Sequence, residues 1–150
     1  MFPVTKSKFA DLLARLFGRA KPPKPAHLRH GAQGEDAARE YLVRRGMKIL
    51  AANYRTPRGE IDIVLRDGDC LAFVEVKTRS SELWTRPARA VNARRRRRLT
   101  RAALDYLRAI HNPEVKIRFD IVEVLLDDER VAEIRHLPNA FPMSRPHRYG

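Results

Sequence analysis

The clearest pattern of apolar and polar positions lies in residues 59–81, where two runs rich in Ile, Val, Leu and Phe surround a short polar break. The break is formed by Asp67, Gly68 and Asp69, which are residue types that favour turns. Two apolar runs of this length around such a break are typical of a β-hairpin. Residues 59–81 are therefore predicted to form two antiparallel strands.

Helical and strand periods alternate along the rest of the chain from residue 34. Apolar and small residues recur at helical spacing before Gly46, and again before the His-Asn-Pro sequence at 111–113. The predicted elements in chain order are a helix at 34–45, a strand at 47–53, the two hairpin strands, a helix that begins at Thr85 and ends before 111–113, and strands at 115–126 and 130–136. This order, αβββαββ, predicts an α/β fold in which helices pack on one sheet.

A chain of 150 residues with 43% hydrophobic residues can bury one core, so one globular domain is expected at 34–137. Residues 1–33 are predicted to be a basic, flexible extension, because an amphipathic run at 9–17 is followed by the Pro-rich segment 21–25. That run is interpreted either as a frayed helix or as a helix for a membrane surface or a partner. The Pro-rich residues 138–150 are predicted to be a loose tail.

The charge of the chain indicates what it binds. The 31 Lys and Arg residues exceed the 18 Asp and Glu residues, for a net charge of +13, so polyanions are expected as partners, nucleic acid before an anionic membrane. A single cysteine, Cys70, excludes an internal disulfide and a cysteine-rich zinc site. No apolar run approaches the roughly 20 residues of a membrane span, and the N-terminus lacks a signal-peptide core. A cytoplasmic protein without integral membrane association is expected.

Two acids, Asp62 and Glu75, lie inside the apolar runs of the hairpin, where acids are uncommon and burial of a lone charge is costly. A two-residue turn at 67–68 would pair Asp62 with Phe73, and a four-residue loop at 67–70 would pair Asp62 with Glu75. Both arrangements put the two carboxylates on the same side of the sheet, because side chains alternate across a strand. A three-residue loop without a bulge would separate them.

Glu35 is a third acid that is predicted to approach the same place, because its helical spacing with Ala38 and Leu42 turns it toward the packed face. Two carboxylates about 4 Å apart repel by roughly 4 kcal/mol at an effective dielectric constant of about 20. A divalent cation would remove this penalty. Oxygen ligands with few histidines favour Mg²⁺ or Mn²⁺ over zinc.

Lys77 lies two residues after Glu75, on the same face of the strand. Its ammonium group would orient or activate an attacking water and offset charge that develops on a phosphate. An alternative interpretation needs no metal, since Glu75, Lys77 and Arg79 would also form a self-neutralising polar face at the end of a strand. Spacing alone leaves both interpretations open.

Three segments of the chain resemble the YraN family, small bacterial proteins of unassigned biological role that are predicted endonucleases. They are GEDAAREYL at 34–42, NYRTPRGEIDIV at 53–64 and FVEVKTR at 73–79, and weaker similarity at 96–107 and 117–124 extends the resemblance to about residues 34–126. That family is similar to archaeal Holliday junction resolvases and so to the PD-(D/E)XK nuclease superfamily. The resemblance implies a restriction-endonuclease-like, resolvase-like mixed β-sheet flanked by helices.

The resemblance also implies roles for particular residues. Asp62 and Glu75 match the two acids of the nuclease motif and would be metal ligands, with the carbonyl of Val76 as a third oxygen. Lys77 matches the catalytic lysine. Glu35 matches the helix glutamate that completes the catalytic and metal site in the resolvase-like branch.

An arginine run at 94–98, followed by Arg101, lies at the start of the stripe of the second helix. The run spans more than one helical turn, so its side chains point in different directions. Arg95 and Arg96 are predicted to extend the apolar stripe toward the site, and the other arginines are predicted to face solvent. The alternative is a solvated basic helix that contacts nothing. No base-reading motif is visible, so recognition of backbone or shape is expected. The predicted nucleic-acid-binding residues are Arg79, Arg94, Arg95, Arg96, Arg97, Arg98 and Arg101.

Taken together, the residues and the resemblance predict a Mg²⁺- or Mn²⁺-dependent endonuclease that hydrolyses phosphodiester bonds in DNA, including branched or flapped DNA. Two alternatives stay open: a catalytically inactive nucleic-acid-binding protein on the same fold, and a basic module associated with RNA or the ribosome. Resolvases of this fold work as dimers, so the resemblance also implies a homodimer.

Overall fold

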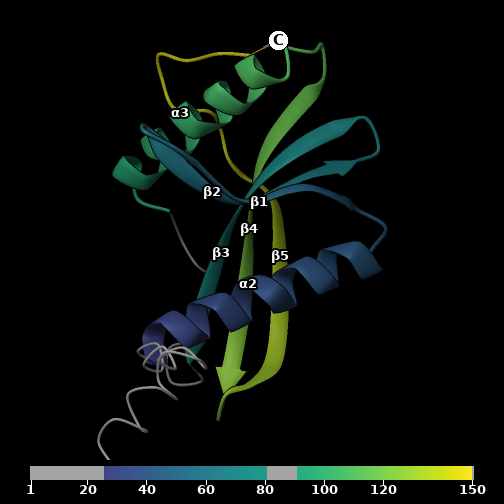
Figure 1. Cartoon of the computed structure of the whole chain (residues 1–150), viewed down its shortest axis with the longest axis vertical. Helices are drawn as coiled ribbons and strands as arrows, with labels where there is room; N and C mark the ends of the chain where they lie inside the picture. The colour runs from purple at the N-terminus through teal and green to yellow at the C-terminus, as the bar shows by residue number, and fades with distance from the viewer. Residues whose placement is uncertain (1–25, 81–90, 150) are drawn as a thin grey trace, which may run out of the picture.

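The computed structural model describes residues 26–80 and 91–149, which form one five-stranded sheet and two helices (Figure 1). The amphipathic run predicted at 9–17 lies outside these residues. The elements in chain order are α2 (Ala26–Arg44), β1 (Lys48–Thr56), β2 (Gly59–Asp67), β3 (Cys70–Ser80), α3 (Ala93–Ala109), β4 (Lys116–Asp127) and β5 (Arg130–Phe141). The predicted order αβββαββ and the α/β fold class are confirmed.

The sheet is mixed, and its strands lie side by side in chain order from β1 to β5. Only β3 and β4 are parallel among the described strands, and the other neighbours are antiparallel. A parallel pair needs a crossover connection, and α3 lies in the crossover from the end of β3 to the start of β4. The two central strands, β3 and β4, therefore run in the same direction along almost their whole length.

The two helices cover opposite faces of this sheet. Leu42 of α2 packs with Val74 and Val122 in one buried cluster, and Leu107 of α3 packs with Phe73 in the other. Neighbouring residues of a strand belong to different clusters because side chains alternate between the two faces. Figure 1 shows α2 across β3, β4 and β5, and α3 toward the end of the sheet where β4 begins. α2 thus covers the central strands on one face, whereas α3 lies on the other face chiefly against β1 and β2.

Both helices begin at residues other than the predicted ones. α2 begins at Ala26 instead of residue 34, because its first turns are mostly exposed and carry no buried stripe that the sequence would reveal. The predicted start at Thr85 lies outside the described residues, and within them α3 begins at Ala93. Asn92 caps this helix by accepting an N–H of the first turn on its Oδ1 at 2.9 Å. Neither of these described helices has the length and apolar character needed to cross a membrane.

The last strand is longer than the sequence pattern predicts. It was expected to end at residue 136, before Pro138, but β5 continues to Phe141. β5 is an edge strand of the described sheet, and an edge strand tolerates proline because one side needs no hydrogen bonds. Phe141 then pairs with Phe119 and is buried. The segment 138–150, predicted to be loose, thus contributes its first residues to the sheet.

Candidate functional site

The hairpin of β2 and β3 has the register that brings Asp62 opposite Glu75. Pairing runs from Ile63 opposite Val74 to the end of β2, where residues 68–69 form the turn. This register is the one predicted for a four-residue loop at 67–70. Asp67 and Cys70 also pair with each other, so the turn itself contains only two residues. The two acids therefore lie at the same level of neighbouring strands.

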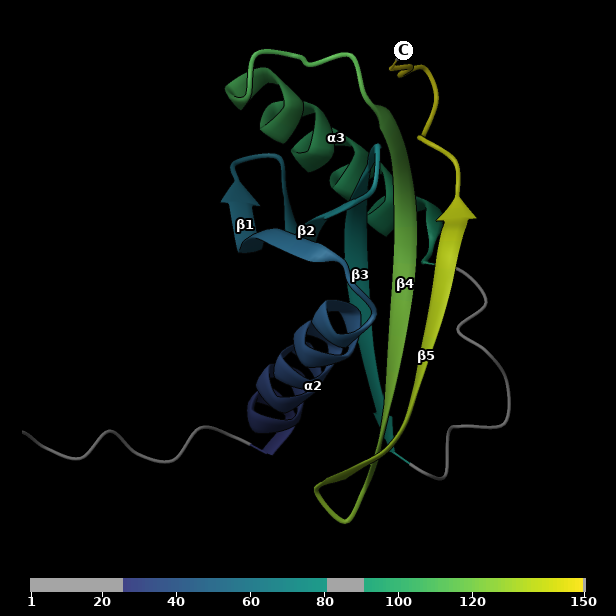
Figure 2. The same ribbon diagram turned by 90° about the vertical axis from the view of Figure 1, so that its right-hand side faces the viewer.

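β2 and β3 separate at Asp62. β2 pairs with β1 along its length, but it pairs with β3 only from Ile63 onward. β3 continues beyond that point beside β4, to Ser80. Figure 2 shows β1 and β2 bending away from the long strands β3, β4 and β5. The start of β2 lies against α3 instead, so closely that a Cβ on Gly59 would overlap the carbonyl oxygen of Arg98. Asp62 thus lies in a fork where β3 loses its neighbour on one edge.

The carboxylate of Asp62 is buried in this fork, with 8% of the residue exposed. The backbone N–H of Val76 donates a hydrogen bond to its Oδ2 at 2.8 Å. Burial, and then the negative charge of Glu75, raise the pKa of Asp62 to about 7, although the Val76 N–H and the Arg95 charge act in the opposite direction. Asp62 therefore changes its protonation near neutral pH and responds to any cation beside it.

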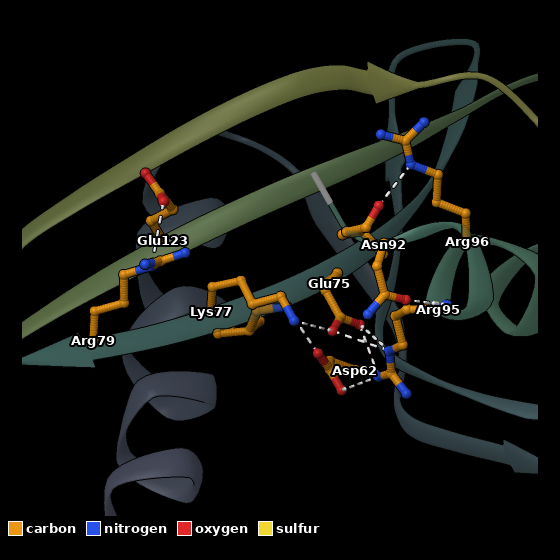
Figure 3. A network of polar contacts seen from close by, with 10 residues as sticks. Asp62, Glu75, Lys77, Arg79, Asn92, Arg95, Arg96 and Glu123 are labelled. Atoms are coloured by element: carbon orange, nitrogen blue, oxygen red, sulfur yellow. Dashed lines mark hydrogen bonds and ion pairs between the residues drawn. The ribbon is translucent and has the colours of Figure 1, made fainter. Parts of the chain in front are cut away.

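Glu75 is buried as well, with 3% exposed, and it meets two cations (Figure 3). Arg95 donates from Nε to Oε1 at 3.0 Å and from Nη2 to Oε2 at 2.8 Å. Lys77 Nζ lies 3.0 Å from Oε1. Arg95 Nη2 also lies 3.9 Å from Oδ1 of Asp62, so one guanidinium group spans both acids. The structure brings Asp62, Glu75 and Lys77 together, and adds Arg95 between the two carboxylates.

Glu35 approaches the fork from α2, on the other face of the sheet. α2 and β3 lie so close together here that a Cβ on Gly34 would overlap Oγ1 of Thr78 in β3. Glu35 lines a cavity of about 770 Å³ together with Val76 and Thr78, and its charge contributes to the raised pKa of Asp62. In the described part of the chain, no three His, Cys, Asp or Glu side chains gather closely enough to hold a metal ion. Glu35 is therefore near the two acids without forming a three-carboxylate cluster with them.

Val76 adds a main-chain oxygen to the fork. The N–H and C=O of one strand residue point to the same edge, so the carbonyl of Val76 faces the fork beside the Asp62 carboxylate. Two carboxylates and a carbonyl are hard oxygen donors of the kind that Mg²⁺ and Mn²⁺ prefer. The position of the Arg95 guanidinium indicates that the fold already places a positive charge between Asp62 and Glu75. The oxygen donors of Asp62, Glu75 and Val76 are thus of the type that a divalent cation takes, with two carboxylates rather than three.

Glu123 is an acid of this region that the sequence interpretation missed. It is fully buried on β4, opposite Lys77, and its Oε1 lies 3.7 Å from Nε of Arg79 (Figure 3). The available signal was an acid inside the apolar run 121–126, the same anomaly that singles out Glu75. Arg79, predicted to bind nucleic acid, is directed toward this buried acid.

Arg95 and Arg96, both predicted to face the site, have different partners. Arg95 reaches the two acids, as described above. Arg96 donates from Nε to the carbonyl oxygen of Val91 at 2.7 Å, and its guanidinium lies over the ring of Phe141 at 5.4 Å. Arg96 therefore anchors the start of α3 to the end of β5.

The other four arginines of α3 that were predicted to bind nucleic acid line a separate basic hollow of about 380 Å³, beside the turn between β1 and β2. Arg58 of that turn belongs to the hollow and also contacts Asp105 of α3. Arg58 was not among the predicted nucleic-acid-binding residues, although it lies in the segment 53–64 that carries the family resemblance. The basic hollow is lined by Pro57, Arg58, Arg94, Arg97, Arg98 and Arg101.

Comparison with known proteins identifies similar sequences over the region that forms this site. Residues 34–124 match the model of a family described as "Uncharacterised protein family UPF0102". A UPF0102 protein of Trichlorobacter lovleyi is 42% identical over 115 residues, which cover 76% of this chain and 91% of the relative. A UPF0102 protein of Chlorobaculum parvum is 45% identical over 116 residues, covering 74% of this chain and 90% of the relative. One of Solibacter usitatus is 52% identical over 99 residues, covering 65% and 75%.

Proposed function

The chain belongs to the uncharacterised protein family UPF0102, the YraN family that its sequence resembles, and we propose that it is a metal-dependent endonuclease that hydrolyses phosphodiester bonds in DNA. Branched or flapped DNA is the proposed substrate. A homodimer, implied by the resemblance to resolvases, belongs to the same proposal, and light scattering of the purified protein checks it.

One observation carries the proposal. Two buried carboxylates, of Asp62 and Glu75, converge with the ammonium group of Lys77 at a fork in the sheet. Burial of two acids side by side is costly, and a protein retains such a pair where a cation or a reaction uses it. The same three residues match the motif of the nuclease superfamily that the sequence resembles.

Each residue of the site has a chemical role in this proposal. Asp62, Glu75 and the carbonyl of Val76 would hold Mg²⁺ or Mn²⁺, and Glu35 would complete the site from α2. When bound, the ion would polarise the phosphoryl oxygen and make water more acidic. Lys77 would orient the attacking water and stabilise the negative charge of the transition state.

The basic hollow supports a nucleic acid as the substrate. Five arginines from α3 and the β1–β2 turn line it, and Arg95 of the same helix reaches the acids. Arginine binds phosphate with paired hydrogen bonds and without reference to base sequence. A duplex backbone that contacts the start of α3 would therefore run beside the fork, in agreement with recognition of DNA shape.

A second candidate function is an inactive nucleic-acid-binding protein. The observation in its favour is that Arg95 and Lys77 balance the charges of Asp62 and Glu75 without a metal ion. In that case the basic hollow would still bind nucleic acid, but the acids would serve only to position α3 on the sheet.

Cleavage assays distinguish these functions. Labelled linear, flapped and four-way-junction DNA is incubated with the protein in Mg²⁺, Mn²⁺ or EDTA, beside structured RNA. The proposal predicts metal-dependent cutting of DNA that Asp62→Asn and Lys77→Ala abolish. Matched controls are Asp69→Asn and Lys48→Ala, since both side chains are exposed and lie away from the fork.

The results discriminate between the candidates directly. Binding of DNA without any metal-dependent cutting would support the inactive protein, and cutting that survives both site substitutions would exclude the proposed site. Preference for RNA over DNA would favour the RNA-associated module instead.

A further inference from the structure

We propose that Arg95 is an internal counter-ion that holds the two acids in the absence of a divalent cation and leaves them when such a cation binds. The inference rests on the proposed function, because it concerns the same two carboxylates. It adds to that function a competition between a side chain of the protein and the metal ion.

The contacts of the acids show why the two cations compete. Both oxygens of Glu75 accept hydrogen bonds from Arg95, at 2.8 to 3.1 Å, and Oε1 also faces Lys77. Asp62 uses Oδ2 for the Val76 N–H and directs Oδ1 toward Arg95. The oxygens that would coordinate an ion between Asp62 and Glu75 are therefore the ones that face Nη2 of Arg95. A metal ion at ordinary coordination distances, about 2.0–2.1 Å for Mg²⁺, would occupy the same space.

The charges lead to the same conclusion. Asp62 and Glu75, when ionised, carry two negative charges, and Arg95 and Lys77 supply two positive charges, so the free site is neutral. A divalent cation added to this arrangement would leave a net charge of +2 in a largely buried place. Departure of Arg95 lowers that excess by one charge, and Lys77 then remains as the catalytic cation.

The position of Arg95 on α3 allows its side chain to move alone. Its backbone N–H is bound to Oδ1 of Asn92 at 2.9 Å, so the first turn of the helix is fixed. Its side chain is 27% exposed, in contrast to 4% for Glu75 and 11% for Asp62. A change of side-chain rotamer would move the guanidinium into solvent without moving the helix. The acids have no comparable path into solvent, because both side chains are buried.

Calorimetric titration with Mn²⁺ tests this competition without any cleavage reaction. The full-length wild type is compared with Arg95→Met, which keeps the length of the side chain but removes its charge. The expected result is binding of Mn²⁺ about tenfold tighter in Arg95→Met, a typical strength for coupling between two groups at one site. Arg97→Met is the matched control, because Arg97 lies on the same helix and faces the basic hollow.

Thermal unfolding gives a second readout. In EDTA, Arg95→Met is expected to melt at a lower temperature than the wild type, because the two acids lose their counter-ion. Saturating Mn²⁺ is expected to stabilise Arg95→Met more than the wild type, since the variant binds the ion more tightly. An arginine with a purely structural role would give the loss of stability without this larger effect of Mn²⁺.

The possible results separate the two proposals. If the wild type and both variants bind Mn²⁺ equally, Arg95 does not compete with the ion, and the proposed nuclease function is untouched. If Arg95→Met binds Mn²⁺ more weakly than the wild type, the inference is also overturned. If none of the three proteins binds Mn²⁺, the metal-dependent function fails and the competition fails with it.

Discussion

At the scale of single residues, the site is defined by acids whose burial is compensated in different ways. Asp62 has one backbone hydrogen bond and a distant guanidinium, and its pKa is raised to about 7. Asp120, although fully buried, is held by Arg118, His136 and the backbone N–H of Asn139. An acid with incomplete compensation is available for chemistry, whereas a fully bonded acid contributes to stability.

The raised pKa of Asp62 predicts a pH dependence of stability. Between about pH 4 and pH 7 the folded protein holds a proton on Asp62 that the unfolded chain has released, so stability falls as the pH rises through this range. Asp62→Asn removes this titration. Urea unfolding in EDTA at about pH 5 and pH 8 should therefore show a larger loss of stability for the wild type than for Asp62→Asn. Equal losses in the two proteins would mean that Asp62 has an ordinary pKa.

The bonds of Asp120 predict a large effect on stability away from the site. Asp120→Ala leaves Arg118 and the buried ring of His136 without their common partner, and should lower the free energy of unfolding by about 3 kcal/mol. Glu114→Ala, at an exposed position before β4, should change it by less than about 0.5 kcal/mol. Denaturant unfolding measures both, and similar values for the two variants would contradict this assignment.

At the scale of elements, the fork is shaped by two glycines whose backbone lies against a neighbouring helix or strand. Gly34 lets α2 lie against β3, and Gly59 lets the start of β2 lie against the backbone of α3. The first approach brings Glu35 near Asp62, and the second separates β2 from β3. The geometry of the site thus depends on two positions that carry no functional group.

Substitution of glycine by alanine should therefore have opposite effects at two positions. Gly59→Ala places a Cβ against the carbonyl of Arg98, and should lower stability by about 1–3 kcal/mol because a backbone atom cannot easily shift. Gly31→Ala lies inside α2 with open space around it, and should raise stability by up to about 1 kcal/mol. Urea unfolding of the two variants checks this contrast, and destabilisation by Gly31→Ala would show that the space is not open.

At the scale of the whole molecule, positive charge is divided between two tasks. Some arginines of α3 and β3 balance acids or anchor α3, namely Arg79, Arg95 and Arg96. Others line the basic hollow beside the β1–β2 turn. In the described part of the chain, no fully buried acid pairs with the arginines of the hollow, so these arginines are expected to provide most of the contacts with phosphate.

The salt dependence of DNA binding follows from this division. Replacing Arg94, Arg97, Arg98 and Arg101 by alanine together should reduce the slope of log affinity against log salt by roughly 3 to 4, since each phosphate contact contributes about 0.9. Arg45→Ala, at an exposed position after α2, serves as the control and should leave the slope unchanged. Fluorescence anisotropy with labelled duplex DNA at several salt concentrations measures the slopes. An unchanged slope in the fourfold variant would place the nucleic-acid surface elsewhere.

The sequence alone determined the class of fold, the order of the elements and the alternation that puts Glu75 and Lys77 on one face of their strand. These features follow from local periods, because alternation along a strand and the 3.6-residue repeat of a helix depend only on neighbouring residues. The boundaries of α2, α3 and β5 were predicted less well, since exposed helical turns and an edge proline carry no periodic signal.

The tertiary structure alone decided which residues meet at the fork. The pairing of Arg95 with Glu75, the position of Glu123 beside Arg79 and the entry of Arg58 into the basic hollow join residues far apart in the chain. Such contacts depend on the crossover between β3 and β4 and on the separation of β2 from β3, which no local pattern encodes. The acids in the hairpin were visible in the sequence, but the cation that lies between them appeared only when α3 was placed on the sheet.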